Sequence, residues 1–275
     1  MLAVLSLLAK DFHSQAVLEM LQNIPNLTWT PGIPEKFHGL SEEHVRLFFS
    51  SKISQIKQKK TRLIGSVPDS FNWTEEKPEC MQIRDQGMCD SNWAFASVGS
   101  FSDNRCISGK DAKRVMYSEE FMISCDNESH GCKGATQFKA PQNFLKENGV
   151  PTDKCVNYTS QYGVTRKCPT ICDDKTPLVL YKSTNYEDVC VDEESIKVAI
   201  TQGSVQTSFT LYTDIMYYTK GIYQHDFGTS EGVHVVSFVG YGVGIYGKET
   251  GIKYWTIRNS WGKTWGEGGY FRIIR

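Results

Sequence analysis

The sequence lacks an excess of charge of either sign and an apolar run long enough to cross a membrane. Its 275 residues include 30 basic and 31 acidic side chains, a formal net charge of −1. This balance gives no reason to expect nucleic acid or an anionic membrane surface as a partner. The apolar run at residues 1–9 is too short to span a bilayer. We interpret residues 1–10 as a signal peptide, or alternatively as a helical turn that packs on the following segment.

Two close cysteine pairs with the spacing of a zinc site are also missing. The nine cysteines stand far apart, which favours a disulfide framework over a metal site, and no cofactor is expected. Disulfides need an oxidising compartment, so we expect the secretory pathway, leading to a lysosome-like endocytic vesicle or to the cell exterior. Four N-x-[ST] triplets agree with that route. They begin at Asn26, Asn72, Asn127 and Asn157.

Helical patterns come first along the chain. Apolar residues between Asp11 and Ile24 recur near helical spacing and predict an amphipathic helix. A second helix is predicted after Ser41, a suitable N-cap, and through Ile53. The polar, basic run at residues 54–62 is interpreted as an exposed connector that proteases can reach. A third helix is predicted at Asn92–Ile107, with a buried apolar stripe.

Strand patterns dominate the second half. His234–Gly242 and Lys253–Asn259 are rich in β-branched and aromatic residues, and the residues between them carry hairpin turn signals. Helices followed by strands are typical of an α+β protein built in two lobes. Met216, Tyr217 and Tyr218 are interpreted as core packing of the β-rich half.

Three motifs carry candidate chemistry. They are DQGMCDSNWAFA (residues 85–96), EGVHVVSFVGYG (residues 231–242) and RNSWGKTWGEGGYFRI (residues 258–273). In this order they resemble the active-site segments of the papain family of cysteine proteases, closest to the cathepsin B branch. The resemblance implies that Gln86 stabilises an oxyanion, His234 is the general base and Asn259 orients its ring. It also implies that Trp261 shields that asparagine and belongs to the substrate cleft. A merely structural histidine is the alternative at His234.

The position that the resemblance assigns to the nucleophilic cysteine is occupied by Asn92. A carboxamide has no anionic form near neutral pH, and its nitrogen lone pair is delocalised, so it cannot attack a peptide carbonyl. Loss of a protease nucleophile lowers kcat by about 10⁶. Asp90 replaces the usual glycine of this motif. In the substrate cleft, Gly134 matches the family, whereas Ala135 and Val233 replace glycines and add side chains.

The resemblance extends over most of the chain. WTPGIPEKF (residues 29–37) is similar to a signature of cathepsin B prosegments, and SVPDSFNW (residues 66–73) to a mature N-terminus. This implies an inhibitory prosegment at residues 11–66 and a papain-like peptidase domain at residues 67–275, with a helical lobe and a β-barrel-like lobe. Relatives continue beyond the position of Arg275, so either the chain is a fragment or one substrate pocket is incomplete. The short stretch between Cys155 and Cys168 holds no histidine-bearing loop, which implies a cleft open at both ends.

The resemblance also implies the disulfide pairs, which spacing alone does not fix. They are Cys80–Cys106, Cys89–Cys132, Cys125–Cys168 and Cys155–Cys172. This leaves Cys190 unpaired. We interpret it as a reactive thiol, an intermolecular link or a buried inert side chain.

Three functions follow from these observations. The favoured one is an inactive, monomeric pseudoprotease that binds peptides, protease inhibitors or prosegments, its own included, in the cleft. The second is an active secreted or lysosomal-type endopeptidase with another nucleophile, such as Ser91. The third is a structural, disulfide-rich extracellular protein. Without its nucleophile the chain would not remove its own prosegment, which another protease would have to cut at the connector.

Overall fold

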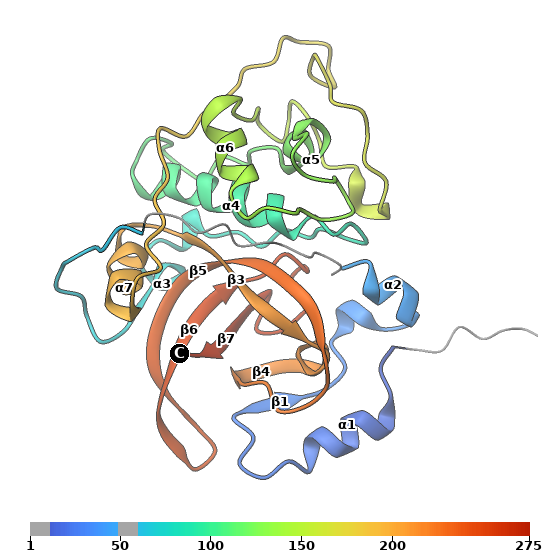
Figure 1. The fold of residues 1–275 in the computed structure, drawn as a ribbon, viewed down its shortest axis with the longest axis vertical. Helices are drawn as coiled ribbons and strands as arrows, with labels where there is room; N and C mark the ends of the chain where they lie inside the picture. Colours follow the sequence, from blue (N-terminus) through green and yellow to red (C-terminus); the bar gives the residue numbers. More distant parts are fainter. Residues whose placement is uncertain (1–11, 49–59) are drawn as a thin grey trace, which may run out of the picture.

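A helical lobe and a β lobe meet along helix α4, and an N-terminal segment lies against the β lobe (Figure 1). The computed structural model describes residues 12–48 and 60–275. Helices fill one lobe and a curved sheet the other, which confirms the predicted α+β architecture in two lobes.

Helix α4 is the centre of the helical lobe. It spans Asn92–Ile107, the bounds that the sequence predicted, and it is buried on nearly every side rather than along one stripe. Small residues such as Ser97 and Gly99 allow this close packing. The other helical elements nearby are α3 (Trp73–Glu76), η2 (Pro78–Cys80), α5 (Glu119–Cys125), α6 (Ala140–Glu147) and η3 (Ser160–Tyr162).

The sheet of the β lobe curls into a barrel-like shape (Figure 1). Its strand order is β1-β4-β7-β6-β5-β2, and β3 pairs with β5. The predicted hairpin is confirmed as β5 and β6, joined by a tight turn in which Gly247 has a φ of 60°. The strands are β1 (Trp29–Pro31), β2 (Phe71–Asn72), β3 (Val205–Tyr212), β4 (Tyr218–Tyr223), β5 (Ser230–Tyr246), β6 (Glu249–Arg258) and β7 (Tyr270–Ile274), with helices α7 (Glu193–Gln202) and η4 (Thr213–Tyr217) beside them.

The N-terminal segment, defined as residues 12–48, forms α1 (Gln15–Gln22), β1, η1 (Glu35–Phe37) and α2 (Glu42–Arg46). Both predicted helices exist, and Ser41 caps α2 by accepting a hydrogen bond from the His44 backbone N–H. The second helix is shorter than predicted, because Leu47 and Phe48 form a turn. The predicted positions Asp11 and Ile53 lie outside the described residues.

The N-terminal segment shares the apolar core of the β lobe. Strand β1 extends the sheet by pairing antiparallel with β4. Six side chains of the N-terminal segment are buried in the same cluster as Met216, Tyr217 and Tyr218. This confirms the core role predicted for those three residues. The six are Leu18, Leu21, Trp29, Phe37, Val45 and Phe48.

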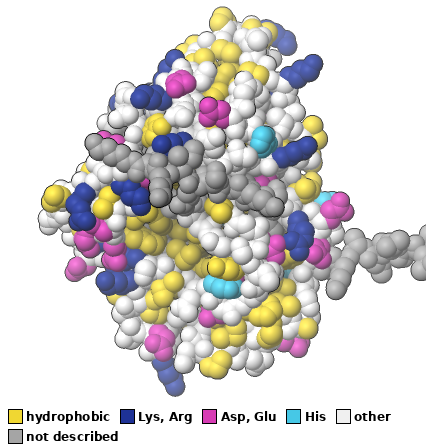
Figure 2. Space-filling model, viewed as in Figure 1, with side chains coloured by type: hydrophobic (Ala, Val, Ile, Leu, Met, Phe, Trp, Pro, Cys, Tyr) yellow, Lys and Arg dark blue, Asp and Glu magenta, His cyan; other side chains and the backbone are white. Residues whose placement is uncertain are grey.

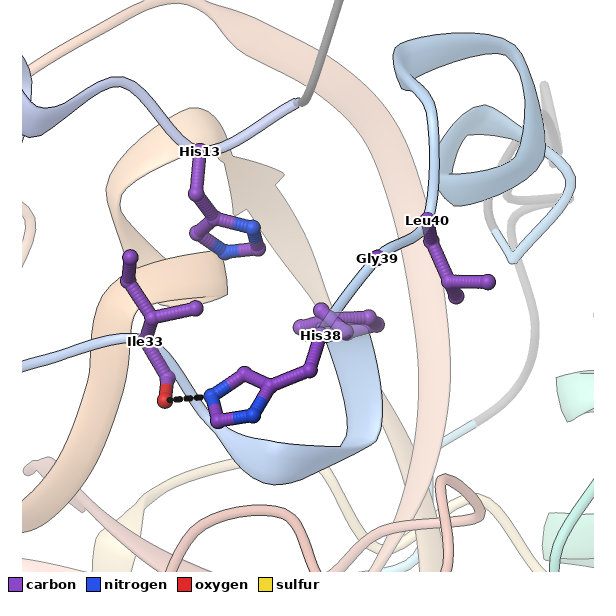
Figure 3. Close-up of a pocket in the computed structure, with 6 residues that line it drawn as sticks. His13, Ile33, His38, Gly39 and Leu40 are labelled. Atoms are coloured by element: carbon purple, nitrogen blue, oxygen red, sulfur yellow. Dashed lines mark hydrogen bonds between the residues drawn. The ribbon is translucent and has the colours of Figure 1, made fainter.

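A small cavity of about 170 Å³ lies within this segment. Figure 3 shows it between His13, Ile33, His38, Gly39 and Leu40. Both imidazoles bond to backbone carbonyls, His13 to Met216 O and His38 to Ile33 O, each at 3.0 Å. One nitrogen of each imidazole is therefore already bonded to the backbone.

All four disulfides expected from the family resemblance are formed. They join Cys80 to Cys106, Cys89 to Cys132, Cys125 to Cys168 and Cys155 to Cys172. Cys190 is a free, exposed thiol, so the alternative of a buried inert cysteine is wrong.

The surface carries no large region of one charge sign on the face that Figure 2 shows, where basic and acidic side chains are interspersed. This agrees with the net charge of −1. None of the helices in the described residues is both long and apolar enough to span a bilayer.

Candidate active site

Asn92 opens helix α4 at the junction of the two lobes and is fully buried. Its side-chain nitrogen donates to Asp90 Oδ1 at 2.6 Å, and its side-chain oxygen accepts from the Val235 backbone N–H at 3.2 Å. Both ends of the carboxamide are therefore fixed, one within the helical lobe and one on strand β5.

His234 stands on β5, next to the residue that contacts Asn92. Its Nε2 lies 2.8 Å from Asn259 Oδ1, which is an acceptor and so fixes Nε2 as the protonated nitrogen. Asn259 Oδ1 also accepts from the Ser260 backbone N–H at 2.8 Å. The Trp261 ring lies 4.7 Å from the imidazole and is itself buried. His234 and Asn259 thus form a rigid pair that is shielded from water.

The other ring nitrogen of His234, Nδ1, is buried. In the part of the chain that the structure describes, no hydrogen-bond partner reaches it. Burial lowers the pKa of His234 from 6.5 to about 4, and the bond to Asn259 offsets only part of this. The ring is therefore a neutral imidazole whose available lone pair, on Nδ1, accepts no proton from a described neighbour.

Gln86 is the fourth predicted site residue at this junction. Its side-chain oxygen accepts from the Ser260 hydroxyl at 2.6 Å, which orients the amide nitrogen. That nitrogen donates to Cys89 O at 2.8 Å and to Phe48 O at 3.2 Å. A backbone carbonyl of the N-terminal segment therefore occupies the donor face of Gln86.

Aromatic and charged contacts hold the N-terminal segment over this junction. The rings of Phe37 and Phe48 meet the ring of Trp261 edge-on, at 5.7 and 6.4 Å between centroids. Lys36 pairs with Asp85 at 2.6 Å and lies over the Phe48 ring. The N-terminal segment therefore contacts both Gln86 and the neighbouring Asp85.

Ser91, the alternative nucleophile, precedes α4 and is buried. Its hydroxyl donates to Cys89 O at 3.3 Å and lies 3.5 Å from the Tyr158 hydroxyl. Neither contact involves His234, whose Nδ1 has no described partner. Among the contacts of Ser91 in residues 12–48 and 60–275, none is with a histidine that could act as its base.

The three predicted cleft residues other than Trp261 differ in their surroundings. Ala135 is buried and packs in the apolar core of the helical lobe. Gly134 has a φ of 88°, a left-handed conformation that favours glycine. Val233 is half-buried on β5, opposite Thr210 of β3.

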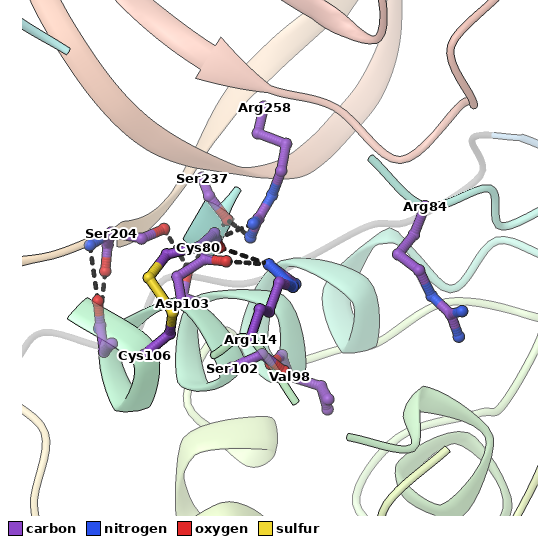
Figure 4. A network of polar contacts seen from close by, with 12 residues as sticks. Cys80, Arg84, Val98, Ser102, Asp103, Cys106, Arg114, Ser204, Ser237 and Arg258 are labelled. Atoms are coloured by element: carbon purple, nitrogen blue, oxygen red, sulfur yellow. Dashed lines mark hydrogen bonds and ion pairs between the residues drawn. A yellow bond between two sulfur atoms is a disulfide. The ribbon is translucent and has the colours of Figure 1, made fainter. Parts of the chain in front are cut away.

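A buried ion network behind the site was not predicted from the sequence. Figure 4 shows Asp103 of α4 between Arg114 and Arg258, with Ser237 beside them. Arg258 ends β6 immediately before Asn259 and also donates to the Ser237 hydroxyl. The network therefore links the end of β6, next to Asn259, to helix α4, which begins at Asn92.

No cluster of three or more His, Cys, Asp or Glu side chains in residues 12–48 and 60–275 has the arrangement of a metal site. The junction offers two oriented groups for chemistry, the imidazole of His234 and the amide donor of Gln86. Beside them lies the carboxamide of Asn92, where α4 begins.

Comparison with known proteins agrees with this arrangement. Residues 67–275 match the family model for papain family cysteine proteases. The chain therefore belongs to the papain family and has the papain-like fold.

Several of its relatives within that family are named cathepsin B-like. The chain is 43% identical over 260 residues to "Cathepsin B-like CP3" of Giardia intestinalis, which covers 91% of this chain and 85% of that protein. It is 31% identical over 310 residues to "Cathepsin B-like cysteine proteinase 5" of Caenorhabditis elegans, and this match covers 97% of this chain and 87% of that protein. Among solved structures, "proCathepsin B S9 from Trypanosoma congolense" superposes with a TM-score of 0.84 at 25% identity, covering 96% of this chain and 94% of that one.

Proposed function

We propose that this cathepsin B-like protein is a pseudoprotease, with Asn92 at the nucleophile position of its family. The observation that carries the proposal is the bonding of Asn92, which is locked between Asp90 and Val235 while His234 Nδ1 has no described partner. The cysteine proteases of this family need a thiolate at this position that pairs with the imidazole, whereas an amide has no proton to lose near neutral pH.

The N-terminal segment acts as the prosegment in this proposal, with the peptidase domain at residues 67–275. Two observations support it. The Trypanosoma relative is a proform by its title and aligns over 96% of this chain, and Phe48 O lies against the amide donor of Gln86. The segment thus occupies the oxyanion position without being cut, since no thiolate is present to cut it.

The retained binding groups favour a role in binding rather than a purely structural one. Gln86, His234 and Asn259 are oriented by hydrogen bonds of 2.6 to 2.8 Å. Such a surface suits extended peptides, protease inhibitors or prosegments of related proteases as ligands. Four disulfides support a location in the secretory pathway.

The test measures turnover and binding separately, in the unaltered chain after another protease has cut it at the connector. We expect no cleavage of dipeptidyl fluorogenic amides and no labelling by a thiol-directed epoxide, but binding of a cystatin-like inhibitor. The uncut chain is the matched control, because its cleft residues are covered by the segment.

Each outcome has a distinct meaning. Turnover by the unaltered chain would show that the proposal of an inactive enzyme is wrong. Absence of inhibitor binding after the cut, in a chain that keeps its thermal unfolding midpoint, would favour the structural role instead.

A further inference from the structure

The turn that follows helix α5 presents an asparagine to solvent. Asn127 is exposed there, and its side chain has no hydrogen bond with any residue that the structure describes. The neighbouring Asp126 builds the turn, because its Oδ1 accepts from the Glu128 backbone N–H at 3.0 Å and its Oδ2 accepts from the Ser129 hydroxyl at 2.7 Å. Asp126 and Ser129 are buried, so the turn leaves Asn127 on its outer side.

The turn is held at both ends. The Cys125–Cys168 disulfide precedes it, and an antiparallel bridge between Ser129 and Ala135 follows it. The same loop therefore carries Asn127 and the predicted cleft residue Ala135.

Asn127 begins one of the N-x-[ST] triplets of the sequence. We infer that Asn127 is the N-glycosylation site of the peptidase domain and receives an oligosaccharide from a polyprenyl-diphosphate-linked donor. This inference rests on the secretory location in the proposed function, because the chain meets such donors along that route. A sugar on Asn127 stays with the peptidase domain after the N-terminal segment has been cut.

The transfer exchanges one bond for another. The side-chain nitrogen of Asn127 forms a bond to C1 of the first sugar, the bond from C1 to the diphosphate oxygen breaks, and the lipid diphosphate leaves with the electron pair. The nitrogen loses one proton to a base of the transferase. The motif requires the hydroxyl of Ser129, which the folded turn buries against Asp126, so the transfer precedes closure of the turn.

Asn72, which begins a second triplet in residues 67–275, presents its amide differently. It is half-buried and caps α3, with its side-chain oxygen accepting from the Thr74 backbone N–H at 3.1 Å. Its side-chain nitrogen donates to Glu75 at 3.3 Å. A sugar on that nitrogen would crowd the start of α3 and weaken the cap.

Asn157 begins the third triplet of the domain and is held by a charged pair. Its side-chain nitrogen donates to Asp173 Oδ2 at 3.3 Å, and the same oxygen accepts from the Asn157 backbone N–H at 2.9 Å. Arg166 pairs with Asp173 at 2.8 Å. A sugar on Asn157 would disturb these bonds, whereas a sugar on Asn127 replaces no contact among the described residues.

The experiment measures sugar occupancy at the three asparagines in the full chain secreted by a eukaryotic cell. An added cleavable secretion signal brings the chain to the transferase, and secretion of the chain without that signal tests the proposed location separately. An amidase that releases N-linked sugars, used in heavy-oxygen water, converts each glycosylated asparagine to a labelled aspartate. Mass spectrometry of the peptides then gives the occupancy at each site.

We expect occupancy at Asn127 to exceed that at Asn72 and at Asn157 several-fold. Equal or lower occupancy at Asn127 would overturn the inference. Asn127→Gln is the matched variant, and after sugar removal from both proteins it should have the thermal unfolding midpoint of the unaltered chain treated in the same way. A lower midpoint in Asn127→Gln would also count against the inference, because the side chain would then have a structural role.

Discussion

Trp29 is the side chain whose removal should most clearly separate the N-terminal segment from the β lobe. It is 1% exposed, lies 5.5 Å from the Tyr223 ring and 6.2 Å from the Tyr218 ring, and donates through Nε1 to Asp226 at 3.1 Å. Replacing a buried Trp with Ala costs about 3–5 kcal/mol. If that loss falls on docking, Trp29→Ala raises the fraction of undocked segment roughly 10²- to 5 × 10³-fold.

Hydrogen exchange measures this change locally. The amide of Ile222 on β4 donates to Thr28 O at 2.8 Å, so its exchange reports on docking of β1. Amides of the β5–β6 hairpin report on the lobe itself. Trp29→Phe is the matched control, because it keeps an aromatic ring but loses the donor to Asp226, a difference of about 1 kcal/mol.

Two results would contradict the reasoning behind this prediction. Unchanged exchange at Ile222 in Trp29→Ala would mean that β1 does not anchor the segment. Equal acceleration at Ile222 and in the β5–β6 hairpin would mean that the segment and the lobe open as one cooperative unit.

Three further predictions concern stability. The folded-state pKa of His234 is about 4, and its ordinary value is 6.5. Neutral His234 therefore makes its full contribution to the unfolding free energy above pH 6.5. That contribution falls by about 3 kcal/mol as the pH decreases from 6.5 to about 4. The urea midpoint of His234→Phe should therefore decrease less at acidic pH than that of the unaltered chain. Arg258→Met should lower the unfolding free energy in the same assay, by less than the about 3–5 kcal/mol of a fully stranded buried charge, because Asp103 loses one arginine partner and keeps Arg114; an unchanged unfolding free energy would refute the network's role. Replacing Cys80 and Cys106 by serine should lower the unfolding free energy by about 2–4 kcal/mol, measured by denaturant unfolding against the unaltered chain, and an unchanged midpoint would contradict it.

The elements that the sequence predicted best are those with local signals. Helix α4 begins and ends at the predicted residues, and the two strands of the β5–β6 hairpin lie where β-branched and aromatic residues concentrate. The second helix was predicted through Ile53, because its apolar pattern continues past Arg46 at Leu47, Phe48 and Ile53. In the structure the ring of Phe48 contacts Trp261, so tertiary packing ends the helix at Arg46.

The candidate site could be predicted only as far as motifs reach. The identities of Gln86, His234 and Asn259 follow from their neighbours in sequence, but their bonding partners do not. The bond from Gln86 to Phe48 O joins residues 38 apart, and the pair of Asp103 with Arg258 joins residues 155 apart. Hydrophobic periodicity carries no information on such pairings, because they depend on how the lobes and the segment meet.

The position of the N-terminal segment decides when the proposed binding role can operate. A covalently attached segment competes with free ligands at an effective concentration on the order of millimolar, so a ligand of micromolar affinity does not displace it easily. The last residues of the connector are also held, because the Thr61 amide donates to Asp188 O at 2.7 Å and Arg62 pairs with Asp192. In the proposed function, a chain without the nucleophilic thiolate does not cut its own connector. The proposed binding role is therefore under the control of whichever protease cuts the segment, and that cut would turn a covered site into a binding site without any chemistry at Asn92.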